Sequence, residues 1–152
     1  MYKRILVPYD GSPPSIRALE EAVSLALDQK ALLGLVHIAD EALLTFDTSG
    51  TLCWEDFLPL LLKGGESLLT DASARARARG AEVETFLLQS GAERVAQAIV
   101  EQSCAWGADL IVMGTHGRRG LRRVVMGSDA EEVVRSATVP VLLVGQAAKP
   151  AE

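Results

Sequence analysis

Short, continuous apolar runs alternate along the chain with longer segments in which apolar residues recur at helical spacing. A continuous apolar run is typical of a strand buried on both faces, and the longer segments predict amphipathic helices. Strands that alternate with helices form a parallel sheet with helices on both faces, so the pattern predicts a single-domain α/β fold. The predicted strands cover Ile5–Val7, Ala31–Ile38, Val83–Leu88, Ala108–Met113 and Val139–Val144.

The predicted helices differ in how clearly their ends are marked. The first begins at Ser12, which can cap a helix, and continues through Pro13-Pro14, which a first turn tolerates. The apolar cluster between Glu41 and Lys63 most simply covers the core, although a lid or a partner surface stays open. Gly64-Gly65 is expected to interrupt any helix there. The first helix should point Ile16, Leu19, Val23 and Leu27 inward, and later helices are expected at Glu66–Arg79, Glu93–Trp106 and Ser128–Ala137.

A glycine-rich loop follows the fourth predicted strand. Gly114 and Gly117 open this loop, and it closes at Gly127-Ser128, where a new helix can begin. Glycine lets backbone N–H groups approach a ligand, Ser128 can cap the helix, and helix N-termini attract phosphate. The layout therefore predicts an anion site, and a nucleotide is the obvious ligand.

Commoner phosphate motifs do not match this loop. It lacks the Gly-Lys pair that a Walker loop requires, and it has no Gly-x-Gly of the dinucleotide fingerprint. The spacing from Gly114 to Gly117 also occurs in KH modules, which clamp a nucleic-acid backbone. Turns alone explain many glycines, so a loop without any ligand stays open as well.

The charge of the chain is acidic overall but unevenly distributed. The length of 152 residues fits one compact domain, and the formal net charge of -5 argues against a general nucleic-acid binder. The loop nevertheless holds a local cluster of cations where the anion site is predicted, unless these residues only keep the loop solvated. The cluster consists of Arg118, Arg119, Arg122 and Arg123.

The other residues that could carry chemistry are isolated in the sequence. Cys53 and Cys104 lie far apart, which fits a reducing compartment. His37 and His116 also stand alone, so side chains by themselves predict no metal site, and one backbone partner would satisfy His37. The chain shows no signal-peptide pattern and no apolar run of about 18 residues, so we expect a cytoplasmic protein without a membrane span.

The sequence also predicts where a ligand binds relative to the strand ends and which strand lies at the edge of the sheet. Asp10 and the glycine loop both follow strands, and ligands of such sheets bind beyond the carboxyl ends of the strands, where the strand order reverses. Pro140 cannot donate a ladder hydrogen bond, which places the last strand at an edge. An open apolar edge invites pairing, so we expect a homodimer through Val139–Val144.

The whole chain from Met1 to Val144 resembles the universal stress proteins, in their nucleotide-binding branch. The resemblance rests on the opening Ile5–Ser12, on Val36–Ile38, on the Gly114, Gly117, Gly127, Ser128 signature and on Val139–Val144. It implies a sheet of order 3-2-1-4-5, like that of the adenine nucleotide alpha hydrolases, an ATP pocket and dimerisation through the last strand. The nucleotide-binding domain would span residues 1–145, with a short tail at 146–152.

The resemblance also implies which residues contact the nucleotide. Pro8 and Asp10 would line it beside the first strand, with Asp10 near the ribose and a phosphate-bound Mg²⁺. Ile38 would meet the adenine through its backbone, and Met113 and Gly114 would flank the ribose. The roles of Ile38 and Met113 rest on the resemblance alone.

The same comparison places the phosphates at the loop and at the helix that follows it. Gly117 would allow close approach, and Gly127-Ser128 would supply N–H and hydroxyl groups. Arg118, a member of the cationic cluster in the loop, would add positive charge. Phosphoryl transfer also needs an oriented nucleophile, and no catalytic base is identifiable in the sequence. We therefore expect a nucleotide-dependent regulator with an unknown protein partner. A slow ATPase or phosphotransferase is the alternative, and RNA binding is disfavoured by the acidic charge.

Overall fold

Five parallel strands form one sheet in the order β3-β2-β1-β4-β5. The computed structural model describes residues 1–40, 54–90, 94–116 and 126–145. Both the parallel pairing and the strand order confirm the predicted fold. The strands are β1 (Arg4–Pro8), β2 (Leu32–Ala39), β3 (Val83–Gln89), β4 (Leu110–Gly114) and β5 (Val141–Val144).

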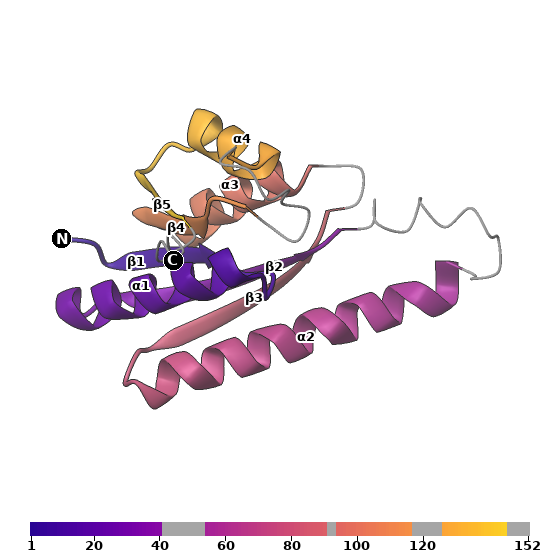
Figure 1. The fold of residues 1–152 in the computed structure, drawn as a ribbon, viewed down its shortest axis with the longest axis horizontal. Coiled ribbons are helices and arrows are strands. Elements are labelled where there is room, and N and C mark those ends of the chain that lie inside the picture. The colour runs from indigo at the N-terminus through magenta and orange to yellow at the C-terminus, as the bar shows by residue number, and fades with distance from the viewer. Residues whose placement is uncertain (41–53, 91–93, 117–125, 146–152) are drawn as a thin grey trace, which may run out of the picture.

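Helices cover both faces of this sheet (Figure 1). On one face lie α1 (Pro13–Gln29) and α2 (Trp54–Ala78), and on the other lie α3 (Val95–Trp106) and α4 (Ser128–Ser136). Each face has its own apolar cluster, and β1 contributes to both, since Ile5 and Val7 face α1 and α2 while Leu6 faces α3 and α4. All three side chains are 0% exposed, as the continuous apolar run predicts.

The first helix begins as the sequence predicts but faces the sheet slightly differently. Ser12 is its N-cap, and the Ser12 Oγ accepts a long hydrogen bond of 3.4 Å from the Ser15 N–H. Leu19 and Val23 are buried as expected, whereas Leu27 is 41% exposed, so its predicted inward position is wrong. Small residues take up the rest of the inward stripe, which lets the helix approach the sheet closely. These residues are Ala18, Ala22 and Ala26.

The predicted break at Gly64-Gly65 is also wrong, because α2 continues through both glycines. A Cβ atom added at Gly65 would lie 2.7 Å from both His37 Cδ2 and Leu87 Cδ1, whereas one at Gly64 would meet nothing within 4 Å. Close packing of the helix on β2 and β3 therefore outweighs the weak helix propensity of glycine. No described helix, α2 included, is long and apolar enough to cross a membrane.

Two further ends follow the predicted signals. Helix α3 ends at Gly107, whose φ of 71° is left-handed and whose N–H donates to Cys104 O and Ser103 O. Strand β5 lies at the edge of the sheet, as Pro140 predicts, and it begins only at Val141. The Pro140 carbonyl still accepts a 3.0 Å hydrogen bond from the Ile111 N–H.

The two adjacent glycines of α2 predict opposite effects of the same substitution. Gly64→Ala should raise the free energy of unfolding by about 0.5–1 kcal/mol, since alanine loses less backbone entropy in a helix. Gly65→Ala should lower it by about 1–3 kcal/mol, because the new methyl group meets the His37 ring. Urea unfolding of both variants checks this, and two equal changes would contradict the packing role of Gly65.

Candidate functional site

The carboxyl edge of the sheet, where β1, β2 and β4 end at Pro8, Ala39 and Gly114, is the point where the strand order reverses. Strand β1 pairs in parallel with β2 on one side and with β4 on the other. From β1 the chain moves outward through β2 and β3 and then returns to β4 beside β1. In open α/β sheets such a reversal leaves a crevice in which ligands bind.

The turn after β1 holds Asp10 at this edge. The Tyr9 N–H donates to Val36 O at 2.8 Å, which continues the ladder one residue past Pro8. The Asp10 Oδ1 accepts the Ser12 N–H at 2.9 Å, an Asx turn that leads directly into the N-cap of α1. The short polar side chain therefore ends the strand and starts the helix.

His37, on the neighbouring strand β2, contacts the turn that holds Asp10. It is 8% exposed, and its Nδ1 lies 2.8 Å from Tyr9 O. A carbonyl oxygen can only accept, so Nδ1 carries the proton and donates it. The structure thus confirms the expectation that one backbone partner satisfies His37, and this bond ties the end of β2 to the turn that holds Asp10.

Ile38 and Met113 lie on the strands that flank β1. Ile38 is half-buried in β2 and Met113 is 6% exposed in β4, and both side chains pack on the side of α3 and α4. Strands in a sheet lie about 4.8 Å apart, so the two residues stand on either side of β1, roughly 10 Å from each other. The fold therefore brings Pro8, Asp10, Ile38 and Met113 to one edge of the sheet.

Gly114 has a packing reason to be glycine. A Cβ atom there would lie 2.6 Å from Pro14 Cβ and 2.8 Å from the Pro14 carbonyl carbon. The first turn of α1 therefore presses directly on the end of β4. The missing side chain of Gly114 is explained by this contact and does not by itself indicate a ligand.

Gly127 joins the start of α4 to the end of β4. Its N–H donates to Thr115 O at 2.8 Å, and a Cβ atom added there would lie 3.3 Å from the same oxygen. Gly127 is the N-cap of α4, and its φ of -61° is open to any residue. The expectation that Ser128 caps the helix is therefore wrong, since Ser128 is the first helical residue and is exposed. The N-cap has no side chain to occupy the N–H groups of the first turn.

His116 is a residue of this edge to which the sequence assigned no role. Its Nδ1 lies 2.8 Å from Thr115 Oγ1, and its Nε2 is buried with no hydrogen-bond partner among the residues that the structure describes. Buried polar atoms are almost always paired, so an unpaired one calls for an explanation such as an absent ligand or water. Its position between Gly114 and Gly117 was the only signal in the sequence.

Two predicted contacts, Gly117 and Arg118, lie outside the described residues. Within the described ranges, no group of three or more His, Cys, Asp or Glu side chains lies together to hold a metal ion. A cation at this edge would thus combine Asp10 with oxygens of a ligand, which is how Mg²⁺ commonly binds beside phosphates.

Burial and nearby charges act on Tyr9, which precedes Asp10. Desolvation raises the pKa of the Tyr9 hydroxyl above its usual value, Arg75 opposes this rise, and Asp10 and Asp71 add to it. The carboxylate of Asp10 is therefore close enough to influence a buried group of the core.

The sheet order and the carboxyl edge define a doubly wound α/β protein. A model of the universal stress protein family matches residues 1–145, and a universal stress protein of Methanocaldococcus jannaschii is 34% identical over 145 residues, which cover 95% of this chain and 82% of the relative. The chain therefore belongs to the universal stress protein family.

Two solved structures of similar fold contain adenine nucleotides. One is a universal stress protein in complex with cAMP, with a TM-score of 0.67 and 26% identity over 95% of this chain and 97% of that one. The other is the universal stress protein from Archaeoglobus fulgidus in complex with dAMP, with a TM-score of 0.67 and 26% identity over 94% of this chain and 98% of that one. Some structural neighbours of this chain thus bind nucleotides.

The raised pKa of Tyr9 predicts a loss of stability in alkali. Below about pH 10, the usual tyrosine pKa, Tyr9 is protonated in both the folded and the unfolded state, and its contribution is fully present. That contribution is lost as the pH rises through the higher folded-state pKa. Between these two values the free energy of unfolding should fall more steeply in the parent than in Tyr9→Phe. Urea unfolding across alkaline pH measures this, and identical slopes would contradict the shift.

Proposed function

We propose that the chain binds ATP with Mg²⁺ at the carboxyl edge between β1 and β4 and acts as a nucleotide-dependent regulator in a stress response. The observation that supports this most is the start of α4, where the N-cap is a glycine, hydrogen-bonded to Thr115, which offers no side-chain cap of its own. A helix N-terminus of this kind favours phosphate through its N–H groups and its dipole.

The proposed contacts divide between the two ends of the nucleotide. Pro8, Ile38 and Met113 take the adenosine, an assignment supported by the adenine nucleotides in the neighbouring structures. Gly127 and Ser128 take the phosphates, and Asp10 takes the Mg²⁺. The buried Nε2 of His116 supports a polar ligand group beside Thr115. Gly114, Gly117 and Arg118 complete the proposed set, as the family resemblance implies.

Regulation follows from binding alone in this proposal. ATP that binds only the folded chain stabilises it by about 2.7 kcal/mol at a hundred times Kd, and it favours whichever conformation binds best. A partner protein would read that conformation. ATP hydrolysis is less well supported than binding, because Asp10 is poorly placed to act as a catalytic base. Its Oδ1 already accepts the Ser12 N–H, and its second proposed role is metal binding. Steady-state phosphate release with excess ATP separates binding from slow hydrolysis.

Gly127→Ser tests the phosphate position directly. A serine N-cap accepts hydrogen bonds from the N–H groups of the first turn and so competes with phosphate, while it supports the helix itself. Isothermal titration should show at least about tenfold weaker ATP binding. The melting temperature of the apo protein should stay close to the parental one.

Gly64→Ser is the matched control, because a Cβ there meets nothing within 4 Å. It should bind ATP as the parent does. A folded Gly127→Ser protein with parental ATP affinity would contradict the proposed nucleotide site.

Asp10→Asn tests the proposed metal role. The amide keeps the size and the acceptor oxygen for the Ser12 N–H but lacks the charge that a hard cation prefers. ATP affinity should fall by about tenfold in the presence of Mg²⁺ and far less in its absence. Titrations with Mg²⁺ and with EDTA measure the difference, and equal losses would assign Asp10 to the ribose or to the turn instead.

We further propose that two copies pair through β5 and its preceding residues, Val139 to Val144. Strand β5 ends the sheet, and Leu142 in its centre is 37% exposed. An apolar edge strand presents unpaired backbone groups to a second copy. Pairing through this edge would continue the sheet across the dimer.

Leu142→Lys should convert the dimer to a monomer, because it places a charge in the centre of the proposed interface. Leu60→Lys provides the control, since Leu60 is 65% exposed on α2 and lies away from β5. Sedimentation velocity compares the two variants with the parent. A Leu142→Lys protein that still sediments as a dimer would rule this interface out.

A further inference from the structure

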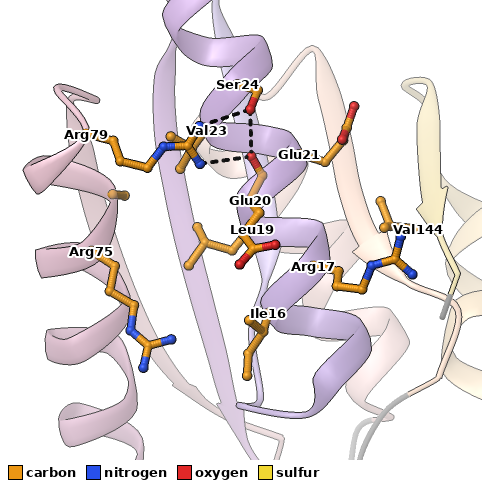
Figure 2. A pocket seen from close by; sticks show the side chains of 11 residues that line it. Ile16, Arg17, Leu19, Glu20, Glu21, Val23, Ser24, Arg75, Arg79 and Val144 are labelled. Carbon is orange, nitrogen blue, oxygen red and sulfur yellow. Dashed lines mark hydrogen bonds between the residues drawn. The ribbon is translucent and has the colours of Figure 1, made fainter. Parts of the chain in front are cut away.

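A groove of about 360 Å³ runs beside α1 on the face that α1 and α2 cover (Figure 2). Its apolar wall includes Ile16, which is half-buried, and the core residues Leu19 and Val23. Arg75 of α2 and Arg79, just after its end, form the cationic side of the groove, and Figure 2 shows both projecting into the space beside α1. Five of the eleven lining residues are charged, so the groove offers charged groups beside its apolar wall.

Two of the three arginines near the end of α2 are held by the fold. Arg77 donates to Val83 O at 2.8 Å, and Arg79 donates to Ser24 Oγ at 3.1 Å and, at the limit of hydrogen bonding, to Glu20 O at 3.5 Å. Arg79 therefore fixes one side of the groove. Cations interact favourably with a helix C-terminus, which explains why arginines occur near the end of α2. This interaction does not explain the face of the helix on which each arginine lies.

Arg75 differs from the other two arginines. It lies one helical turn before Arg79 on the same face, and it makes no hydrogen bond or ion pair with any residue that the structure describes. Like charges at this spacing repel each other, and an anion beside Arg75 would lower that repulsion. The guanidinium offers a planar fork that matches a carboxylate or a phosphate.

The acidic residues of the groove decide between these two anions. Glu20 and Glu21 line the same groove as the arginines. Their charges repel a doubly charged phosphate more strongly than a singly charged carboxylate. The apolar wall at Ile16 and Leu19 adds a place for a hydrocarbon body beside the charged group.

We propose that this groove is a second ligand site, which takes a small organic monocarboxylate with its carboxylate on Arg75 and its apolar body on Ile16 and Leu19. The site is separate from the carboxyl edge, because none of the residues proposed there for the nucleotide lines the groove. It therefore stands whether or not ATP binds at the edge.

Titration of the full chain with octanoate, octanol and inorganic phosphate tests the proposal. Octanoate should bind in the millimolar range or more tightly, and octanol and phosphate should each bind at least about tenfold more weakly. Arg75→Gln should weaken octanoate binding by about tenfold or more, since it removes a charge-assisted hydrogen bond. Its melting temperature should match the parental one, because Arg75 makes no hydrogen bond with the described residues.

Arg135→Gln is the matched control, with the same charge change on α4, where Arg135 pairs only with the exposed Glu131 among described residues. It should bind octanoate as the parent does. The proposal is overturned if octanoate does not bind the parent, or if Arg75→Gln binds octanoate with parental affinity. It is also overturned if phosphate or octanol binds as tightly as octanoate, or if ATP displaces octanoate competitively.

Discussion

The burial of β1 between two helical layers is the constraint on which the rest of the structure depends. Ile5, Leu6 and Val7 are fully buried, and the strand pairs with a neighbour on each side. A strand in this position has no exposed edge and no exposed face, so only its end can carry polar chemistry. Asp10 lies at that end, in the turn that also starts α1.

Close contacts of glycines set how near the helices come to the sheet. Gly114 lets Pro14 press on β4, Gly65 lets α2 lie on His37, and a Cβ at Gly34 would lie 2.8 Å from the Trp106 ring. In well-packed interiors such contacts leave no room for a methyl group. The glycines of the family signature consequently have different structural roles. Gly114 serves the packing of α1, whereas Gly127 joins the start of α4 to the carboxyl edge.

Helix α1 connects the two proposed sites. Its N-cap is part of the Asp10 turn, and its outer surface forms the wall of the groove that Arg75 and Arg79 complete. Charges at both Asp10 and Arg75 act on the pKa of the Tyr9 hydroxyl. A ligand at either proposed site therefore contacts α1, which also forms part of the other site.

The sequence by itself determined the strands, the start of α1, the edge position of β5 and the place of the glycine loop. It could do so because continuous apolar runs, a Ser-Pro-Pro start and Pro140 act through local geometry and backbone hydrogen bonding. The order of the strands came from family resemblance, since periodicity carries no information about which strands are neighbours.

Tertiary structure decided what local pattern could not. It carried α2 through Gly64-Gly65, turned Leu27 outward and made Gly127 the N-cap of α4. It also buried the Nε2 of His116 with no partner among the described residues. For Gly65 the deciding group is the His37 ring, which is far away in the sequence but lies directly against the helix in the fold. Helix propensity and capping preference amount to about 1 kcal/mol per residue, and packing contacts of several kcal/mol override them.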